Sequence, residues 1–244
     1  MSLKKTAKYT VNLLGIISIL LISCSLYKET KRNSEDNGTI PLPTLSLGKA
    51  CSFENKCINA FIFQGKISED SATILESSIH EVSKIGTLCF HSAGGEGKAM
   101  VRISRQLRER NIATCVANKY VLGNNEIFSK VSTQNGIKEG AICASACSFI
   151  LLSADKRILV GDMALIGIHS PFTVLDLCFC DLNLPFSIIN DKSHISNVIS
   201  MLPDPVHKKM INELYTLSLK TKSKSMHFMS EIELQEYRIF NYTY

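Results

Sequence analysis

A serine, a histidine and a pair of glycines are the residues of this chain whose types and settings could do chemistry together. Ser145 lies in the run Cys-Ala-Ser-Ala-Cys, inside an apolar segment, and His169 follows 24 residues later, after an apolar stretch. Gly94 and Gly95 also follow an apolar stretch. A serine hydroxyl becomes an effective nucleophile when a neutral imidazole within hydrogen-bond reach accepts its proton. The set therefore predicts nucleophilic catalysis at serine, if the fold brings its members together.

Each of these residues also has a plainer interpretation. Ser145 taken alone is a small residue that permits a helix to pack on a sheet, and His169 taken alone is a structural histidine. His91, beside the glycine turn, is interpreted as a structural or supporting residue. No chemistry is assigned to the remaining histidines, which are His80, His194, His207 and His227. Only the convergence of serine, histidine and glycines favours a site.

The elements that must position these residues alternate between strand and helix. The sequence predicts a strand over 60–67, a helix that Ser68 caps, a second strand over 87–90 and, after the glycine turn, a second helix. A third strand is predicted over 112–116. This β-α-β-α-β order favours a parallel sheet covered by helices.

The second half of the chain continues this pattern after an interruption. Residues 119–140 are rich in Gly and Asn and are expected to form an inserted hairpin or loop. Residues 141–152 predict a buried passage from strand to helix that contains Ser145. Further strands are predicted over 157–160 and 165–168, and helices over 203–219, with Val206, Met210, Leu214 and Leu217 inward, and over 230–237.

These segments, in this order, resemble the ClpP-like branch of the ClpP/crotonase superfamily, and above all its exported single-domain relatives. FHSAGG (90–95) is similar to the glycine turn of that family, and CASACSFILLSADKR (143–157) to its nucleophile segment. ALIGIHSP (164–171) is similar to its histidine segment and MSEIELQEY (229–237) to its closing segment. The resemblance covers roughly residues 58–240.

The resemblance implies an α/β fold that is a spiral of β-β-α units with a mostly parallel sheet. It implies a serine hydrolase, of the peptidase class, that acts on a peptide or protein and needs no cofactor or metal. Ser145 matches the nucleophile and His169 the general base, while the backbone N–H groups of Gly95 and Ala146 match the oxyanion hole. ClpP-like proteins oligomerise, so the resemblance also implies a homo-oligomer.

The third member of the family's catalytic triad has no counterpart. The family's aspartate position falls on Met226. His169 is then oriented by another acid, with Asp191 and Asp204 as candidates, or by a backbone carbonyl, or the site is inactive. The alternative function is therefore a catalytically inactive lipoprotein that keeps the fold for binding or assembly. Acyl-CoA chemistry, found in crotonase relatives, is disfavoured because an exported protein meets no coenzyme A.

The first 23 residues are predicted to be an export signal. They combine three lysines, no acid and an apolar run of about 12 residues, too short to cross roughly 30 Å of hydrocarbon as a helix. The run ends in Leu-Ile-Ser-Cys, which resembles the bacterial lipobox, so Cys24 is expected to be lipidated and to anchor the chain. The predicted location is the bacterial cell envelope, on the periplasmic side, and Ser25 favours the outer membrane.

Composition supports this organisation. Residues 24–50 are polar, hold two prolines and are expected to form a lipidated tether, with the ClpP/crotonase-like domain over residues 51–244. Beyond the export signal, 24 Lys and Arg stand against 22 Asp and Glu, so no basic footprint for nucleic acid remains.

Nine cysteines, eight without Cys24, permit disulfides in an exported protein. The candidate pairs are Cys51 with Cys57 and either Cys178 with Cys180 or Cys115 with Cys143, although eight cysteines allow 105 pairings. Cys89 and Cys147 are interpreted as buried small hydrophobes. Zinc is disfavoured because the spacings lack two CxxC knuckles.

Overall fold

The computed structural model describes residues 42–133, 136–177, 180–185, 193–221 and 225–244. The described residues form a mixed α/β structure and belong to two compact units. The larger unit holds 42–171 and 185–244, and includes all candidate site residues that are described. The other contributes a hairpin of β12 (Phe172–Leu177) and β13 (Cys180–Pro185), which form a two-stranded sheet of their own.

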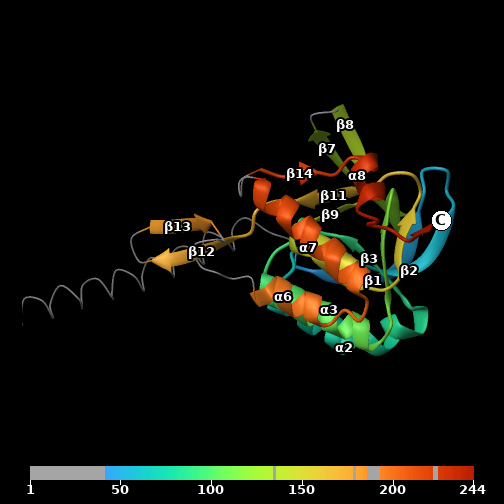
Figure 1. Ribbon diagram of the computed structural model, residues 1–244. Helices are drawn as coiled ribbons and strands as arrows, with labels where there is room; N and C mark the ends of the chain where they lie inside the picture. The colour runs from blue at the N-terminus through green and yellow to red at the C-terminus, as the bar shows by residue number, and fades with distance from the viewer. Residues whose placement is uncertain (1–41, 134–135, 178–179, 186–192, 222–224) are drawn as a thin grey trace, which may run out of the picture. The chain divides into compact units, whose positions relative to one another are not determined.

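An eight-stranded sheet is the core of the larger unit, in the order β15-β10-β4-β3-β2-β1-β5-β6. Figure 1 labels β1, β2 and β3 of this sheet. The four pairings from β15 to β2 are parallel, and the three from β2 to β6 are antiparallel. The sheet is therefore mixed, which corrects the expectation of a mostly parallel one. Its strands are β1 (Thr44–Cys51), β2 (Cys57–Gln64), β3 (Thr87–His91), β4 (Ala113–Ala117), β5 (Lys119–Leu122), β6 (Asn125–Ile127), β10 (Arg157–Val160) and β15 (Tyr242–Thr243).

Strand β1 overturns the expected start of the folded domain at residue 51. It pairs with β2 along its whole length and with β5 near its end. Leu47 on this strand is 59% exposed, so one face of β1 meets solvent. A strand with one wet face shows no continuous apolar run, and the flanking prolines of this segment are typical of a linker.

Helices α2 (Glu69–Ile85) and α3 (Gly97–Glu109) form as their sequences predict. Ser68 accepts a hydrogen bond from the Ser71 N–H as the N-cap of α2, and Gly86 ends that helix in the left-handed conformation. The two helices pack on each other and bury apolar side chains such as Leu75 of α2 and Leu107 of α3. They connect successive parallel strands, and so they place the glycine turn between β3 and α3.

A second sheet carries the residues with chemical potential. It has the order β14-β11-β9, with β9 (Ile142–Ala144) parallel to β11 (Leu165–Ile168) and β14 (His227–Phe228) antiparallel to β11. Helix α4 (Ala146–Ser153) follows β9 after one residue, Ser145. All eight residues of α4 are buried, which matches the predicted strand-to-helix passage.

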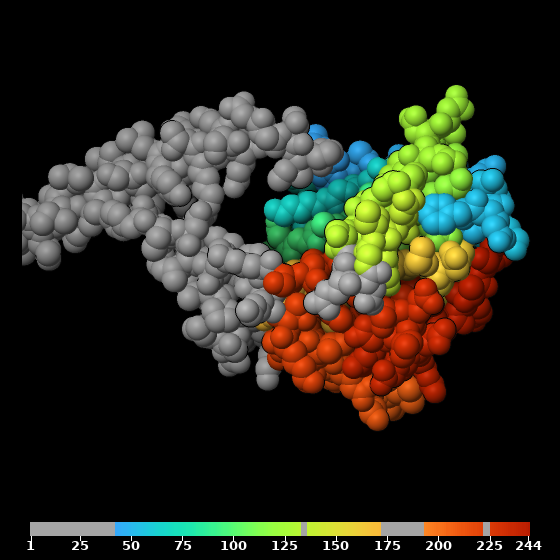
Figure 2. All heavy atoms as spheres, turned by 90° about the horizontal axis from the view of Figure 1, so that it is seen from above, coloured from blue at the N-terminus to red at the C-terminus, as the bar shows by residue number. Residues whose placement is uncertain are grey.

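Residues 119–140 form two hairpins, as the prediction of an insertion allows. The first is β5 with β6, and the second is β7 (Ser129–Thr133) with β8 (Gly136–Gly140). In Figure 2 the yellow-green residues of this insertion lie at the surface, beside the orange and red C-terminal residues. The insertion returns the chain to β9 and the candidate site.

The C-terminal part adds helices α6 (Ser193–Ser200), α7 (Pro205–Lys220) and α8 (Glu231–Glu236). Helix α6 packs on α3 and was not predicted. The predicted inward stripe of α7 is wrong at its first member, because Val206 is 62% exposed and His207 is buried in its place. At the start of α7 the buried face of the helix therefore begins one residue later than predicted.

Three disulfides join cysteines of the larger unit. The predicted pair Cys51–Cys57 is confirmed. The pair Cys115 with Cys143 is wrong, because the two cysteines bond to Cys89 and Cys147 respectively. Cys89 and Cys147 are therefore not simple buried hydrophobes. The pair Cys178 with Cys180 involves Cys178, which lies outside the described residues.

Candidate functional site

Three parallel segments end side by side, and the candidate residues lie at these ends. Ser92, just after β3, forms a parallel bridge with Cys143 of β9, so that two residues further along Gly94 comes opposite Ser145. On the other side of β9, Ala144 pairs with Gly167 of β11. His169 follows Gly167 by two residues, directly after the end of β11. Since neighbouring strands lie about 4.8 Å apart, the serine is flanked by the glycine turn and by the histidine segment.

Hydrogen bonds fix this alignment. The Ser92 N–H donates to the Ile142 carbonyl at 2.7 Å, and the Ala144 N–H donates to the Ser92 carbonyl at 2.9 Å. The Ser145 N–H donates to the Gly167 carbonyl at 2.8 Å. The backbone of Ser145 is thus bound to a residue two positions before His169.

Ser145 has a backbone conformation that non-glycine residues rarely adopt. Its φ is 57° and its ψ is −123°, at the turn between β9 and α4. Such a conformation costs about 1–3 kcal/mol and persists only where the surroundings impose it. A serine on a strained strand-to-helix turn presents its hydroxyl outward in many hydrolases. Within the described structure the Ser145 hydroxyl does not cap its own helix, although serine is a favoured N-cap residue.

The glycine turn approaches the serine so closely that no side chain fits between them. A β-carbon built on Gly94, whose φ is 102°, would lie 2.5 Å from the β-carbon of Ser145 and 3.1 Å from the Ala146 nitrogen. A β-carbon on Gly95 would collide with the carbonyl of Ile67. Both glycines are therefore required by space as well as by their backbone angles.

In the glycine turn, the N–H of Gly95 points away from the neighbouring segment that contains Ile67. The Ile67 N–H donates to the Gly94 carbonyl and the Glu96 N–H donates to the Ile67 carbonyl, both at 2.9 Å. Because peptide groups alternate in direction along an extended chain, the Gly95 N–H points away from Ile67. Ala146 is the first residue of α4, and such residues have no N–H partner inside the helix. No hydrogen bond among the described residues uses the N–H of Gly95 or of Ala146.

His169 has its ring orientation set by a main-chain carbonyl. Its Nδ1 lies 2.8 Å from the carbonyl oxygen of Ser170, and the side chain is half-buried. A carbonyl can only accept, so Nδ1 carries the proton. In the neutral ring Nε2 is then the acceptor nitrogen, which is the form that a general base requires.

Met226 lies at the position to which the resemblance to ClpP-like proteins assigns the acid. Extending the antiparallel register of β14 with β11 by one residue places Met226 opposite His169. The Met226 sulfur packs over Gly167, 2.8 Å from where a β-carbon of that glycine would lie. A thioether cannot supply the charge of a carboxylate. Among the described contacts of His169, the Ser170 carbonyl is the partner of Nδ1.

Of the two acids named as alternatives, only Asp204 lies among the described residues. Asp204 caps α7 by accepting from the Val206 and His207 N–H groups at 3.1 Å, so it is wrong as the orienting acid. Asp191 lies outside the described residues. Glu233 binds His227 at 2.8 Å, but His227 pairs with Ile168, and side chains of successive residues point to opposite faces of a sheet. The Glu233 carboxylate therefore lies on the opposite face of the sheet from the side chains of Met226 and His169.

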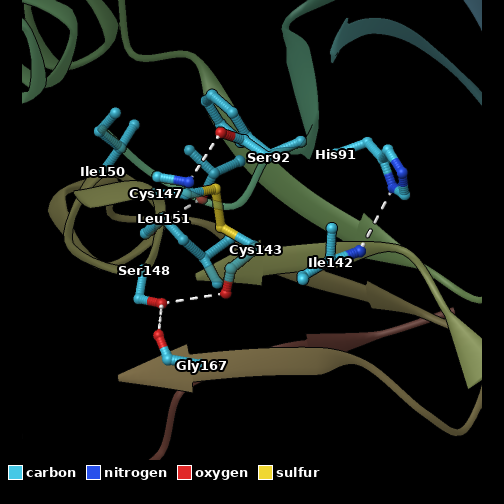
Figure 3. The surroundings of a disulfide bond; sticks show 12 residues. His91, Ser92, Ile142, Cys143, Cys147, Ser148, Ile150, Leu151 and Gly167 are labelled. Atoms are coloured by element: carbon cyan, nitrogen blue, oxygen red, sulfur yellow. Dashed lines mark hydrogen bonds between the residues drawn. A yellow bond between two sulfur atoms is a disulfide. The ribbon is translucent and has the colours of Figure 1, made fainter. Parts of the chain in front are cut away.

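Several supporting residues went unnoticed in the sequence (Figure 3). The Ser148 hydroxyl lies 3.0 Å from the Cys143 carbonyl and 2.9 Å from the Gly167 carbonyl, and its single proton is shared between them. The Ser92 hydroxyl accepts from the Gly94 N–H at 3.1 Å. The Cys143–Cys147 disulfide closes a short loop of the chain that contains Ser145. The cysteines on either side of Ser145 were visible in the sequence, but their spacing did not predict that they form a disulfide with each other.

Two histidines lie near the site in supporting positions. His91 accepts from the Ile142 N–H at its Nδ1, so its Nε2 carries the proton and donates to the Ser129 hydroxyl, each at 3.3 Å. Burial lowers the pKa of His91. The ring of His194 in α6 packs against Gly97, at the start of α3. His91 thus ties the β7–β8 hairpin to β9, as its structural interpretation predicts.

The described residues hold no group of three metal-ligating side chains. Within the same residues, no helix combines the length and apolarity needed to cross a membrane. Cys24, the predicted lipidation site, lies outside the described residues.

Comparison with known proteins gives no family for this chain. No family model matches it, and no curated protein is found as a relative. Among solved structures, a mutant of 1510-N, a membrane-bound stomatin-specific protease, is similar over 75% of this chain and 77% of that chain, with 15% identity and a TM-score of 0.45. A likeness at this level carries no inference about activity.

Proposed function

We propose that this chain is a serine hydrolase of the peptidase class, with a ClpP/crotonase-like arrangement of its strand and helix units. Ser145 is the nucleophile and His169 the general base. The N–H groups of Gly95 and Ala146 form the oxyanion hole. The observation that carries the proposal is the register that aligns the glycine turn, Ser145 and the segment of His169 at the ends of three parallel segments.

The chemistry follows from these positions. The Ser145 oxygen attacks the substrate carbonyl while Nε2 of His169 takes its proton. Negative charge then develops on the former carbonyl oxygen, and the N–H groups of Gly95 and Ala146 stabilise it. His169 returns the proton to the leaving amine, and water repeats the sequence on the acyl-enzyme.

In the proposed dyad the Ser170 carbonyl accepts the Nδ1 proton of His169 and takes the orienting place of the carboxylate. A carbonyl stabilises the imidazolium less than a carboxylate does, so we expect a slow enzyme. Loss of the aspartate in a full triad costs roughly ten-thousandfold in rate, which sets the scale of this deficit.

The test is covalent labelling of the purified protein with a fluorophosphonate probe. We expect the label on Ser145, none on Ser145→Ala, and at least hundredfold slower labelling of His169→Gln. Ser148→Ala is a useful comparison, since Ser148 is a neighbouring serine whose hydroxyl is bound to two carbonyls. Labelling that survives in Ser145→Ala would refute the proposal.

Met226 favours a second candidate, a binding or assembly protein that keeps the fold without catalysis. This alternative expects no label on the wild-type protein at any pH. It also expects that Ser145→Ala leaves the biological role of the chain intact. The same labelling experiment thus separates the two candidates.

We also propose that lipid on Cys24 anchors the chain in the cell envelope, on the strength of the lipobox-like sequence. Cys24→Ala should lose radiolabelled palmitate and move from the membrane to the soluble fraction. Ser25→Ala keeps the cysteine and is the matched control. Retention of both label and membrane binding in Cys24→Ala would contradict the anchor.

A further inference from the structure

The Cys143–Cys147 disulfide encloses the proposed nucleophile. Cys143 belongs to β9 and Cys147 is the second residue of α4, so the crosslink spans the strand-to-helix turn (Figure 3). Only Ala144, Ser145 and Ala146 lie between them. Both cysteines are fully buried, and their Cα atoms are 5.2 Å apart.

The enclosed turn is the part of the site that most needs support. Ser145 holds its left-handed φ of 57° between two elements of different geometry. Hydrogen bonds also hold it: the Ser145 N–H donates to the Gly167 carbonyl, the Ser148 N–H donates to the Ser145 carbonyl at 3.1 Å, and the Ser148 hydroxyl shares one proton between two carbonyls. A covalent link between the residues two before and two after Ser145 restricts both neighbouring peptide groups, including the one that bears the Ala146 N–H.

A role in global stability is the weaker explanation for this crosslink. In the chain-entropy model a disulfide stabilises more as the loop it closes becomes longer. The sequence separation is 4 for Cys143–Cys147, against 6 for Cys51–Cys57 and 26 for Cys89–Cys115. Of the three described disulfides, the one around Ser145 therefore constrains the unfolded chain least.

We propose that the Cys143–Cys147 disulfide is a positioning crosslink, which holds the Ser145 oxygen and the Ala146 N–H in the geometry for attack. The cysteines touch no substrate and act through these two residues. This inference rests on the proposed function of Ser145. It implies that the hydrolase reaches its full rate only after the disulfide has formed.

The test compares Cys143→Ala/Cys147→Ala with Cys51→Ala/Cys57→Ala. The control removes a disulfide at the start of β2, where Cys57 lies. The end of β2 that adjoins the site is the other one, where Gln64 pairs with His91. We expect fluorophosphonate labelling of Ser145 to slow at least tenfold in the first variant and less than twofold in the control. On a small ester substrate, kcat should fall with KM unchanged. Amide hydrogen exchange in residues 144–148 should accelerate in the first variant alone.

The outcomes separate this inference from the proposed function. If the wild-type protein labels and Cys143→Ala/Cys147→Ala labels equally fast, the positioning role is overturned while the hydrolase stands. If the wild-type protein does not label, the hydrolase is refuted, and unchanged exchange in residues 144–148 would overturn the crosslink's role as well. Cys143→Val/Cys147→Ala fills more of the buried volume and replaces the first variant if that one does not fold.

Discussion

Gly94 lies so close to Ser145 that a β-carbon on the glycine would be 2.5 Å from the β-carbon of the serine. The parallel bridge between Ser92 and Cys143 explains this approach. Gly94 lies two residues after Ser92, and Ser145 lies two residues after Cys143. The turn that carries one proposed oxyanion donor is therefore in direct contact with the proposed nucleophile.

The first prediction concerns this contact. Gly94→Ala should slow fluorophosphonate labelling of Ser145 at least hundredfold, because the new methyl group displaces either the turn or the serine. It should also lower the free energy of unfolding by about 2 kcal/mol or more, from overpacking and the positive φ. Labelling kinetics and urea unfolding measure the two effects.

Gly123→Ala is the matched control. Gly123 also has a positive φ, 61°, but nothing lies within 4 Å of a β-carbon built on it. It should lose about 1–2 kcal/mol of stability from the left-handed backbone and keep its labelling rate. Similar labelling losses in both variants would show that the contact with Ser145 is not the cause.

The second prediction concerns the missing acid. Met226→Asp places a carboxylate opposite His169, where it can accept from Nδ1 and stabilise the imidazolium that forms during attack. We expect the labelling rate to rise at least tenfold over the wild-type protein. Met226→Asn has the same shape without the charge, and should not exceed the wild-type rate. Equal rates for Asp and Asn would mean that no charge at this position reaches the histidine.

Most of the elements could be predicted from local signals. The helix from 69 to 85 is bounded by the Ser68 cap and Gly86, and both signals stand in the sequence. The strands β3 and β11, which lead to the glycine turn and to His169, are short apolar runs that sequence patterns detect well. Strand β1 was not predicted because one of its faces is exposed, and helix α6 was not predicted because it has few apolar positions.

The candidate site could be predicted only as a set of residues, because its geometry depends on register between distant segments. Cys143 and Cys147 illustrate the limit. Four residues apart in an extended strand, their Cα atoms would be about 13 Å apart. The turn at Ser145 brings them to 5.2 Å, and this reversal is not visible in spacing. Cys89 and Cys115 likewise meet only because β3 and β4 pair in register.

A third prediction concerns Arg157, which is buried, donates from its guanidinium to three carbonyl groups and has its Nη1 3.3 Å from Nε2 of His207. It donates to Ile239 at 2.8 Å, to Ala154 at 3.0 Å and to Arg238 at 3.3 Å. Arg157→Met removes these donors and leaves buried carbonyls unpaired, which should cost about 3 kcal/mol of stability. Arg105→Met, on the exposed face of α3, should cost less than about 0.5 kcal/mol. Equal losses in urea unfolding would contradict the role of these bonds.

The last prediction is a loss of stability in weak acid that comes from His207. Burial lowers the pKa of His207, and the neighbouring Arg157 guanidinium lowers it further. Its Nε2 lies 2.5 Å from the Leu152 carbonyl and therefore carries the proton of the neutral ring. A second proton on Nδ1 would create a cation beside Arg157 in the protein interior.

The sign follows from the two states of the chain. The unfolded histidine binds a proton near pH 6.5, while the folded one binds it only at lower pH. Below pH 6.5 the unfolded state therefore holds more protons, and the free energy of unfolding falls until the pH reaches the folded pKa. Above pH 6.5 this contribution is fully present. His91, whose pKa burial also lowers, adds a slope of the same sign.

Unfolding in urea at a series of pH values between 8 and 4.5 measures this slope. His207→Gln keeps an N–H that can donate to Leu152 but cannot gain a proton, so its stability should depend less on pH below 6.5 than that of the wild-type protein. His80→Gln is the control, because His80 is exposed on α2 and should leave the slope unchanged. A wild-type slope that persists in full in His207→Gln would assign the acid sensitivity to His91 or to other groups, and would exclude the buried contact of His207 with Arg157 as its source.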